Sequence, residues 1–294
     1  MHLREPRLHR RSDNSIPAKN SFIGEPEDHF LSNNKICFHF GYPDGGEVLN
    51  AWKVLITDDD LSNCTPEEVA DAVFSYETPN KLMNDASFLA VHGLAYSIVI
   101  YNDSSIWNLE NNVICIVDCV PIDGTIQLNV SFVNQVDFQA RMVELFGINR
   151  TNKPLIYATT EFEGYLSDVS VPGCPREDIT LFPGDCDLAV YNAQLNTICV
   201  VEFKKHTMSG YGSIEYQSFL KYFYKDRKKY EQIAKITRKL GNEYFYNIIY
   251  STKPDELRKV KIEKVSTNLR LLSSAVYTFN SLDELDVIFG NLMR

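Results

Sequence analysis

The segment from Gly184 to Thr207, with the sequence GDCDLAVYNAQLNTICVVEFKKHT, constrains the fold of this chain more than any other feature. Two runs rich in β-branched and aromatic residues, Leu188–Tyr191 and Thr197–Lys204, flank the polar sequence NAQLN. This pattern predicts two strands joined by a turn, that is, a β-hairpin. Because alternate side chains of a strand share a face, a hairpin fixes where the charged residues at its ends can point.

Three charged residues lie at the ends of the predicted strands. Glu202 and Lys204 are two positions apart on the second strand and therefore point to the same face. If Tyr191 pairs with Ile198, Asp187 lies directly opposite Glu202. A shift of one residue in this register would place the two carboxylates on opposite faces, so the prediction depends on the loop.

Two carboxylates and an amine on one patch of sheet suit divalent-metal phosphodiester chemistry. Hard cations such as Mg²⁺ take one or two carboxylates together with water and substrate phosphate oxygens. Without a metal, Asp187 and Glu202 would repel each other. Lys204 beside them can orient a metal-bound water, help to deprotonate it and steady the phosphate. The alternative is an ordinary ion pair on a solvated sheet face, since an acid and a lysine at a strand end are common.

In this pattern the hairpin resembles the PD-(D/E)XK nuclease superfamily, in which an Asp precedes a strand and an apolar strand ends in Glu-x-Lys. The matching residues are Asp187, Glu202 and Lys204. The literal Pro-Asp pair is absent, and its nearest equivalent is PGDCD, with Pro183 and Asp185 just upstream. The resemblance implies a restriction-endonuclease-like mixed central sheet flanked by helices. It also implies a Mg²⁺- or Mn²⁺-dependent endo- or exonuclease that acts on nucleic acid, with DNA favoured over RNA.

A non-catalytic nucleic-acid or protein-interaction module that keeps this fold is the second hypothesis. The intact Asp, Glu and Lys count against it, since a degenerate site usually lacks one of the three.

The resemblance also adds catalytic candidates. Some members place a glutamine one helical segment after the lysine, and Gln217 matches it, although the position four residues later is Lys221 rather than tyrosine. The family has a glutamate on a helix before the hairpin, and the segment Asn134–Gly147 offers Glu144. Competing carboxylates in this region are Asp137, Glu161 and Glu163.

The segment from about Ser213 to Leu240 has helical periodicity and is followed by Gly241, a residue typical of the position after a helix. From Lys204 to Lys239 there are ten Lys and Arg against three Asp and Glu. A stripe of lysines opposes an apolar stripe, and next to a metal site such a basic face suits contact with backbone phosphates. A solvated helix face is the common alternative. Including the residue after Lys204, the predicted nucleic-acid contacts are Lys205, Lys221, Lys225, Lys228 and Lys235.

Composition and charge divide the chain into unequal parts. The 294 residues, 44% hydrophobic and 23% charged, suit one large or two ordinary domains. Residues 200–294 carry 17 basic and 11 acidic side chains, whereas residues 1–199 carry 12 and 28. We expect a flexible basic and polar arm over residues 1–31, an N-terminal α/β domain over 32–130 and the nuclease-like domain over 131–294.

Several further elements are predicted on either side of the hairpin. KICFHF and AWKVLI predict a hairpin, TPEEVADAVFSY a helix capped by Thr65, and AYSIVIY and VICIVDCV two buried strands. Turn residues in PIDG (Pro121–Gly124) indicate a possible domain boundary, although Thr125–Phe132 could equally extend the same sheet. Towards the C-terminus, YNIIYST and AVYTF predict strands, and SLDELDVIFGNL predicts a helix with Ser281 and Glu284 spaced as a capping box.

The remaining expectations concern partners and setting. No apolar run approaches transmembrane length and the charged start lacks a signal-peptide stretch, so no membrane partner is expected. Seven cysteines without zinc spacing predict a reducing, cytoplasmic setting. Since one such site cuts one strand, cleavage of both strands of a duplex would suggest a homodimer. A regulatory ligand or protein at the N-terminal domain is a hypothesis without a motif, and His206 is expected at the surface.

Overall fold

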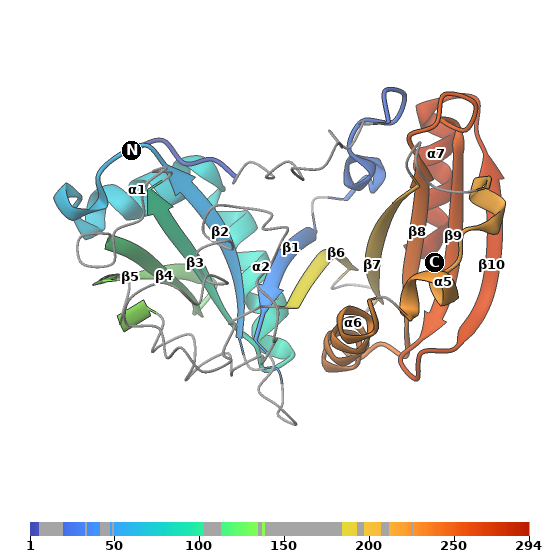
Figure 1. The fold of residues 1–294 in the computed structure, drawn as a ribbon. Helices are drawn as coiled ribbons and strands as arrows, with labels where there is room; N and C mark the ends of the chain where they lie inside the picture. Colours follow the sequence, from blue (N-terminus) through green and yellow to red (C-terminus); the bar gives the residue numbers. More distant parts are fainter. Residues whose placement is uncertain are drawn as a thin grey trace, which may run out of the picture. The chain divides into compact units, whose positions relative to one another are not determined.

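Both halves of the chain contain strands and helices, as its mixed α/β pattern predicts (Figure 1). The computed structural model describes residues 1–5, 20–32, 34–41, 48, 50–102, 113–134, 137–138, 184–192, 197–206, 212–224 and 226–293. Two compact units divide the chain: unit 1 comprises Met1–Ser12 and Phe38–Gly184, and unit 2 comprises Asp13–Cys37 and Asp185–Arg294. These bounds differ from the expected divisions after residues 31 and 130.

Unit 1 is built on strands in the spatial order β1-β2-β3-β4-β5, with its boundary falling inside β1. β2 and β3 run parallel, and the other neighbours are antiparallel. A parallel pair requires a crossover, which the helices between β2 and β3 provide. The elements are β1 (Lys35–Phe40), β2 (Asn50–Thr57), η2 (Leu61–Asn63), α1 (Pro66–Tyr76), α2 (Pro79–Val91), β3 (Ala95–Asn102), β4 (Val113–Ile122) and β5 (Thr125–Asn134).

Unit 2 has strands in the spatial order β10-β9-β8-β7-β6. β7 and β8 run parallel across a helical crossover, and the other neighbours are antiparallel. The strands are β6 (Gly184–Asn192), β7 (Thr197–His206), β8 (Tyr244–Ser251), β9 (Lys259–Ser266) and β10 (Leu271–Thr278). The helices are η1 (Pro26–His29), η3 (Ile214–Tyr216), α5 (Phe219–Phe223), α6 (Arg227–Lys239), α7 (Leu282–Gly290) and η4 (Asn291–Met293).

The two units share one succession of strand pairings. In each, an antiparallel hairpin leads through a helical crossover to a parallel strand, and two antiparallel strands follow. Asn247 is the fourth residue of β8 and Ile98 the fourth residue of β3, so the two occupy corresponding places. We find no internal sequence repeat, and the correspondence is therefore one of topology alone.

Local signals in the sequence explain where several helices begin and end. Thr65 and Glu68 form a reciprocal capping box at the start of α1, and the Ser281 hydroxyl accepts the backbone N–H of Glu284 at the start of α7. Each such cap stabilises a helix by about 1 kcal/mol. Gly241 has a positive φ of 80° directly after α6, the conformation expected of a glycine in that place. The predictions for Thr65 and Gly241 are confirmed. At α7 only the Ser281 half of the predicted capping box is observed, and Glu284 Oε2 accepts the backbone N–H of Asn280 at 2.7 Å.

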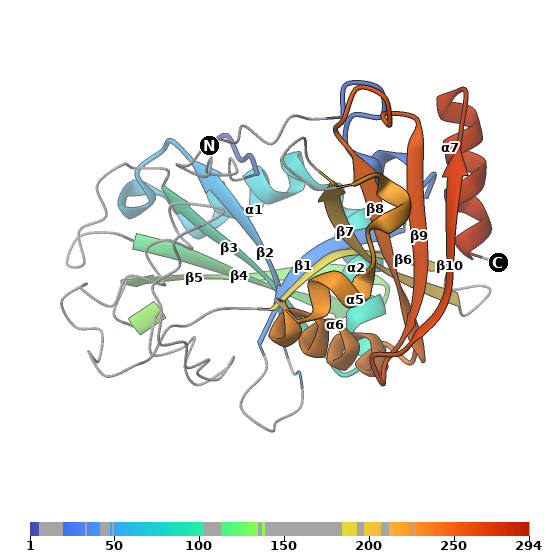
Figure 2. The same ribbon diagram turned by 45° about the vertical axis from the view of Figure 1, so that its right-hand side comes forward.

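The helix predicted from Ser213 to Leu240 is interrupted, and this prediction is wrong. The segment forms η3, α5 and α6 in succession, and the last two appear as separate helices in Figure 2. Two carboxylates accept backbone donors at the starts of η3 and α5: Glu256 accepts the N–H of Ile214 at 2.9 Å, and Glu263 accepts the N–H of Phe219. These tertiary hydrogen bonds satisfy the N-termini of short helices, which periodicity along the sequence cannot reveal.

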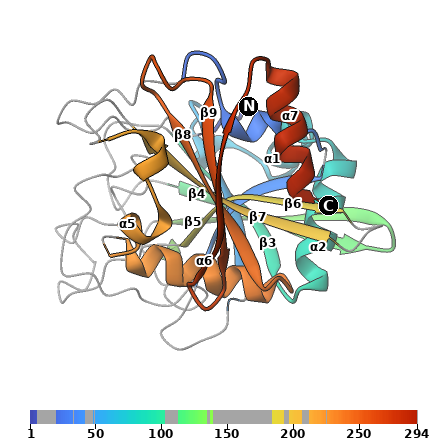
Figure 3. The ribbon, with the colours of Figure 1, turned by 90° about the vertical axis from the view of Figure 1, so that its right-hand side faces the viewer.

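One face of the unit 2 sheet packs against α7 and η1 in an apolar core. Figure 3 shows α7 on one side of β8–β10 and the α5–α6 segment on the other. Phe30 stacks on Phe289 at a ring distance of 4.7 Å, and Ile23 joins the same core. Near the start of the chain, Arg4 pairs with Ile56 of β2. Both described parts of the expected N-terminal arm therefore pack onto a unit.

Among the described helices, none has the length and apolar character to cross a membrane.

Candidate functional site

The register of the β6–β7 hairpin is the one that the sequence predicts. Tyr191 pairs with Ile198, and Leu188 pairs with Val201. Extending this register by one residue brings Asp187 opposite Glu202. In addition, Asp187 Oδ2 accepts the backbone N–H of Phe203 on the neighbouring strand at 2.7 Å. This hydrogen bond fixes the Asp187 carboxylate beside β7.

Two lysines surround the carboxylate of Glu202. Lys204 Nζ lies 2.9 Å from Glu202 Oε1, and Lys229 Nζ, from α6, lies 2.8 Å from the same oxygen. Lys229 Nζ is also 3.8 Å from Asp187 Oδ1. The Glu202 side chain is fully buried, whereas those of Asp187 and Lys229 are 23% and 29% exposed. The site therefore opens to solvent on the side of Asp187 and Lys229.

A third carboxylate and a phenol ring complete the surroundings of Lys204. Lys204 Nζ lies 3.5 Å from Asp226 Oδ2 and 5.3 Å from the centre of the Tyr230 ring. Burial, and then the charge of Glu202, raises the pKa of Tyr230 well above its usual range, so its hydroxyl stays protonated. Lys204 thus has partners of its own, independent of Lys229.

The oxygens of Glu202 are the best indication of a ligand in this site. Neither has a hydrogen bond of good geometry in the described part of the chain, although two ammonium nitrogens approach Oε1. Oε2 is buried and has no hydrogen-bond partner among the described residues, which is costly for a carboxylate. Together with Asp187, this free oxygen fits a hard cation that completes its shell with water and phosphate. Among the described residues, no group of three or more His, Cys, Asp or Glu converges to hold a metal.

Glu202 belongs to a row of polar side chains that crosses the unit 2 sheet. Directly paired residues of β7, β8, β9 and β10 share its face: Glu202, Asn247, Glu263 and Ser274. Asn247 Nδ2 donates to Glu263 Oε2 at 3.0 Å, and the Tyr230 hydroxyl of α6 donates to Asn247 Oδ1 at 3.2 Å. The row is therefore a continuous polar layer beneath α6.

The structure describes one of the two other catalytic candidates, Gln217. Gln217 is buried between η3 and α5, where its Oε1 accepts hydrogen bonds from Lys221 Nζ at 2.9 Å and the Tyr222 hydroxyl at 3.2 Å. Its side chain thus makes hydrogen bonds with two residues of α5. Glu144 lies outside the described residues, and so does Lys225.

The predicted basic contacts do not form one stripe. On β7, Lys205 alternates with Lys204 and therefore points to the opposite face from Glu202. Lys228 is exposed on α6 and Lys235 lies two turns further along the same helix. The break between α5 and α6 separates these two from Lys221 on α5.

Sequence reasoning missed four members of the site region, namely Lys229, Asp226, Asn247 and Glu263. The sequence gives a weak signal for Lys229: it directly precedes Tyr230, which belongs to the apolar stripe of the predicted helix. The expectation for His206 is wrong, because this residue is buried and its Nε2 lies 3.1 Å from the Gly212 carbonyl oxygen. Burial lowers the pKa of His206 and favours its neutral form.

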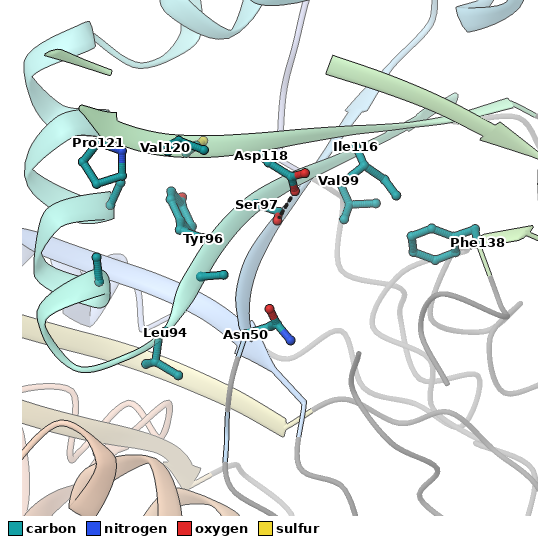
Figure 4. Close-up of a pocket in the computed structure, with 14 residues that line it drawn as sticks. Asn50, Leu94, Tyr96, Ser97, Val99, Ile116, Asp118, Val120, Pro121 and Phe138 are labelled. Carbon is teal, nitrogen blue, oxygen red and sulfur yellow. Dashed lines mark hydrogen bonds between the residues drawn. The ribbon is translucent and has the colours of Figure 1, made fainter. Parts of the chain in front are cut away.

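Unit 1 contains a cavity of about 370 Å³ (Figure 4). Ser97 Oγ donates to Asp118 Oδ1 at 2.7 Å in its lining, as Figure 4 shows. Val99, Ile116 and Phe138 provide apolar walls nearby. The single carboxylate among the described lining residues is already hydrogen-bonded, so the cavity suits binding of a small, mainly apolar group rather than metal chemistry.

No protein-family model and no curated protein matches the chain. Among solved structures, the chain is similar to one described as the crystal structure of sex pheromone staph-cAM373 precursor, at 11% identity over 94% of this chain and 84% of that chain. The TM-score of 0.21 is too low for this likeness to support any inference about fold or function. The site is therefore interpreted from its own side chains.

Proposed function

We propose that this chain is a divalent-metal-dependent nuclease of the PD-(D/E)XK type, with DNA as the favoured substrate. The observation that carries the proposal is the convergence of Asp187, Glu202 and Lys204. The register sets the two carboxylates opposite each other, and Lys204 Nζ lies 2.9 Å from Glu202 Oε1. Two carboxylates with a lysine beside them are the groups that phosphodiester hydrolysis with Mg²⁺ or Mn²⁺ requires.

Each residue of this trio has a separate role in the proposal. Asp187 and Glu202 would hold Mg²⁺ or Mn²⁺, which when bound polarises the phosphate and acidifies a water ligand. Asp187 is aimed by the backbone N–H of Phe203, so its carboxylate needs little reorganisation to act as a ligand. Lys204, held over the Tyr230 ring, would orient the attacking water and balance negative charge on the phosphate.

The topology of unit 2 supports a restriction-endonuclease-like core. A hairpin that bears the acidic residues is followed by a helical crossover and a parallel strand, β8, beside β7. The helix of this crossover, α6, faces the carboxylates and contributes Lys229. Exposed Lys228 on the same helix would contact the nucleic-acid backbone as a sequence-independent point charge.

A non-catalytic module with the same fold is the second candidate, and one observation favours it. Lys204 and Lys229 already neutralise Glu202 without any metal, as in a structural ion-pair network. Such a module would bind nucleic acid through its lysines but leave it intact. Binding without cleavage would thus distinguish it from the nuclease.

Cleavage assays on plasmid, linear and single-stranded DNA and on RNA, with Mg²⁺ or Mn²⁺, test the proposal. Asp187→Ala and Lys204→Ala should each lower the rate by about a thousandfold, the scale expected when one group that stabilises reacting charge is lost. Asp255→Ala, at an exposed carboxylate remote from the hairpin in sequence, should leave it unchanged. Absence of cleavage by the wild type on every substrate, or equal rates for all variants, would overturn the catalytic assignment.

A further inference from the structure

Lys229 occupies the position between the two carboxylates where a cation would bind. Its Nζ lies 2.8 Å from Glu202 Oε1 and 3.8 Å from Asp187 Oδ1. We propose that Lys229 is a resident counter-ion that a divalent cation displaces, and that its released ammonium then contacts a phosphate of the substrate. This inference rests on the proposed metal site and adds a regulatory step to it.

The burial of Glu202 explains why a resident counter-ion is needed. Its side chain has no exposure to solvent, and a buried carboxylate without a positive partner is strongly destabilising. A lysine meets this need with one flexible, compact charge. A divalent cation brings twice the charge and several coordination positions, so it competes for the same oxygens.

The two lysines at Glu202 differ in position and in exposure. Lys229 lies within ion-pair distance of both carboxylates that would hold the metal. Lys204 has a second carboxylate, Asp226 at 3.5 Å, and lies over the Tyr230 ring, so it keeps partners when a metal arrives. Lys229 has the more exposed side chain, 29% against 15% for Lys204. It can therefore turn outward, and Lys229 rather than Lys204 is the displaced group.

The backbone of α6 keeps the displaced amine close to the site. Tyr230, the next residue, is fully buried and donates a hydrogen bond to Asn247 of β8. The helix is thereby fixed at this point, and only the Lys229 side chain needs to move. Exposed Lys228 precedes it, so an outward-turned Lys229 would complete a pair of ammonium groups at the start of α6. Metal binding would thus strengthen the attraction of the site for a polyanionic phosphodiester backbone.

Titration of the intact chain with Mn²⁺, followed by calorimetry and by the electron paramagnetic resonance of free Mn²⁺, tests the displacement. Lys229→Gln removes the competing cation and should bind Mn²⁺ about tenfold more tightly, the scale of coupling typical of two linked binding events. Arg227→Gln, two residues away and exposed on the same helix, is the matched control and should bind as the wild type does. Asp187→Asn should weaken binding at least about tenfold, since a ligand is lost.

A second measurement needs no variant and covers the case in which Lys229→Gln fails to fold. Pulse acylation of lysine amines, read by peptide mass spectrometry, should modify Lys229 several-fold faster with Mn²⁺ than without it, while Lys228 reacts equally in both. Equal or weaker Mn²⁺ binding by a folded Lys229→Gln, or acylation of Lys229 that Mn²⁺ does not change, overturns the displacement.

The proposed function fails in ways that these results separate from failure of the displacement. If Mn²⁺ binds through Asp187 but no nucleic acid is cleaved, the proposed nuclease activity is rejected. The Lys229 results then still decide whether the metal displaces this lysine. If Mn²⁺ binds and nucleic acid is cleaved, but the acylation of Lys229 does not change, only the displacement of Lys229 is rejected. No Mn²⁺ binding by either the wild type or Lys229→Gln overturns both.

Discussion

Units 1 and 2 follow the same succession of strand pairings but fill corresponding places with opposite chemistry. In each unit, a row of directly paired residues crosses the sheet on the face covered by the crossover helices. The row starts on the strand that precedes the crossover. In unit 2 the row is Glu202, Asn247, Glu263 and Ser274. In unit 1 it is Lys53, Ile98, Val117 and Val130.

The difference shows that this topology does not require a polar layer. Ile98 and Val117 are fully buried and pack without hydrogen-bonding needs, and Lys53 is paired at the edge of the row with Glu77 at 2.8 Å. In unit 2, Glu202 and Glu263 are equally buried but carry carboxyl groups. Burial of charge costs free energy that apolar packing would avoid, so the unit 2 row is better explained by a site than by the fold.

The largest expected effect comes from making the unit 1 row resemble the unit 2 row. Val117→Asp places a carboxylate at a fully buried position that has apolar neighbours on both adjoining strands, Ile98 and Val130. The free energy of unfolding should fall by about 4 kcal/mol, as for other unpaired buried charges. Urea denaturation measures it, with Val117→Ile as the size control. A loss below about 1 kcal/mol would show that unit 1 accepts a polar row.

A smaller loss is expected from removing a carboxylate of the unit 2 row. Glu263→Ala leaves the backbone N–H of Phe219 and the side-chain amide of Asn247 without their acceptor. Each orphaned buried donor costs about 1–3 kcal/mol, so the free energy of unfolding should fall by about 3 kcal/mol. Glu263→Gln keeps an acceptor oxygen and should lose less than half as much. Equal losses in urea denaturation would mean that the charge, and not the hydrogen bonds, matters here.

A gain in stability is expected when the site is replaced by apolar groups. Glu202→Leu combined with Lys229→Met makes this part of unit 2 like unit 1, and Lys204 keeps Asp226 as its partner. Substituting a buried ion pair in this way is neutral or stabilising, here by about 1 kcal/mol. Each single substitution should instead destabilise, because Glu202 then keeps only Lys204 as a counter-charge, or Lys229 keeps only the more distant Asp187. The double variant should also lose cleavage activity, and a double variant that is less stable than both single variants would contradict this reading.

The smallest effect concerns pH. Burial lowers the pKa of His206 in the folded chain below its ordinary value of 6.5. As pH falls below 6.5, the unfolded chain takes up a proton that the folded chain does not, so stability declines until the folded-state pKa is passed. His206→Gln should flatten the dependence of the unfolding free energy on pH below 6.5 and leave it unchanged above. Thermal denaturation at several pH values measures this dependence. If the unfolding free energy of the variant changes with pH as steeply as that of the wild type, His206 is not the cause of the dependence.

The sequence was most informative where local rules decide the structure. The alternation around Glu202 and the length of the loop predict the register that places Asp187 opposite it, and Thr65 marks the start of α1. Lys229 could not be assigned to the site in this way, because its approach to Glu202 depends on how α6 packs across the sheet. The starts of η3 and α5 likewise depend on Glu256 and Glu263, which lie far along the chain.

The hydrogen bond between Asp187 and the amide of Phe203 gives the site its own reporter. Hydrogen exchange at a single amide measures how often that donor is released from its acceptor. Exchange at Phe203 therefore measures the fraction of time in which the Asp187 carboxylate leaves β7. A ligand that engages only Oδ1 would slow this exchange by holding the carboxylate in place, whereas one that takes Oδ2 would accelerate it. The position of one acidic side chain can thus be followed in solution without any change to the protein.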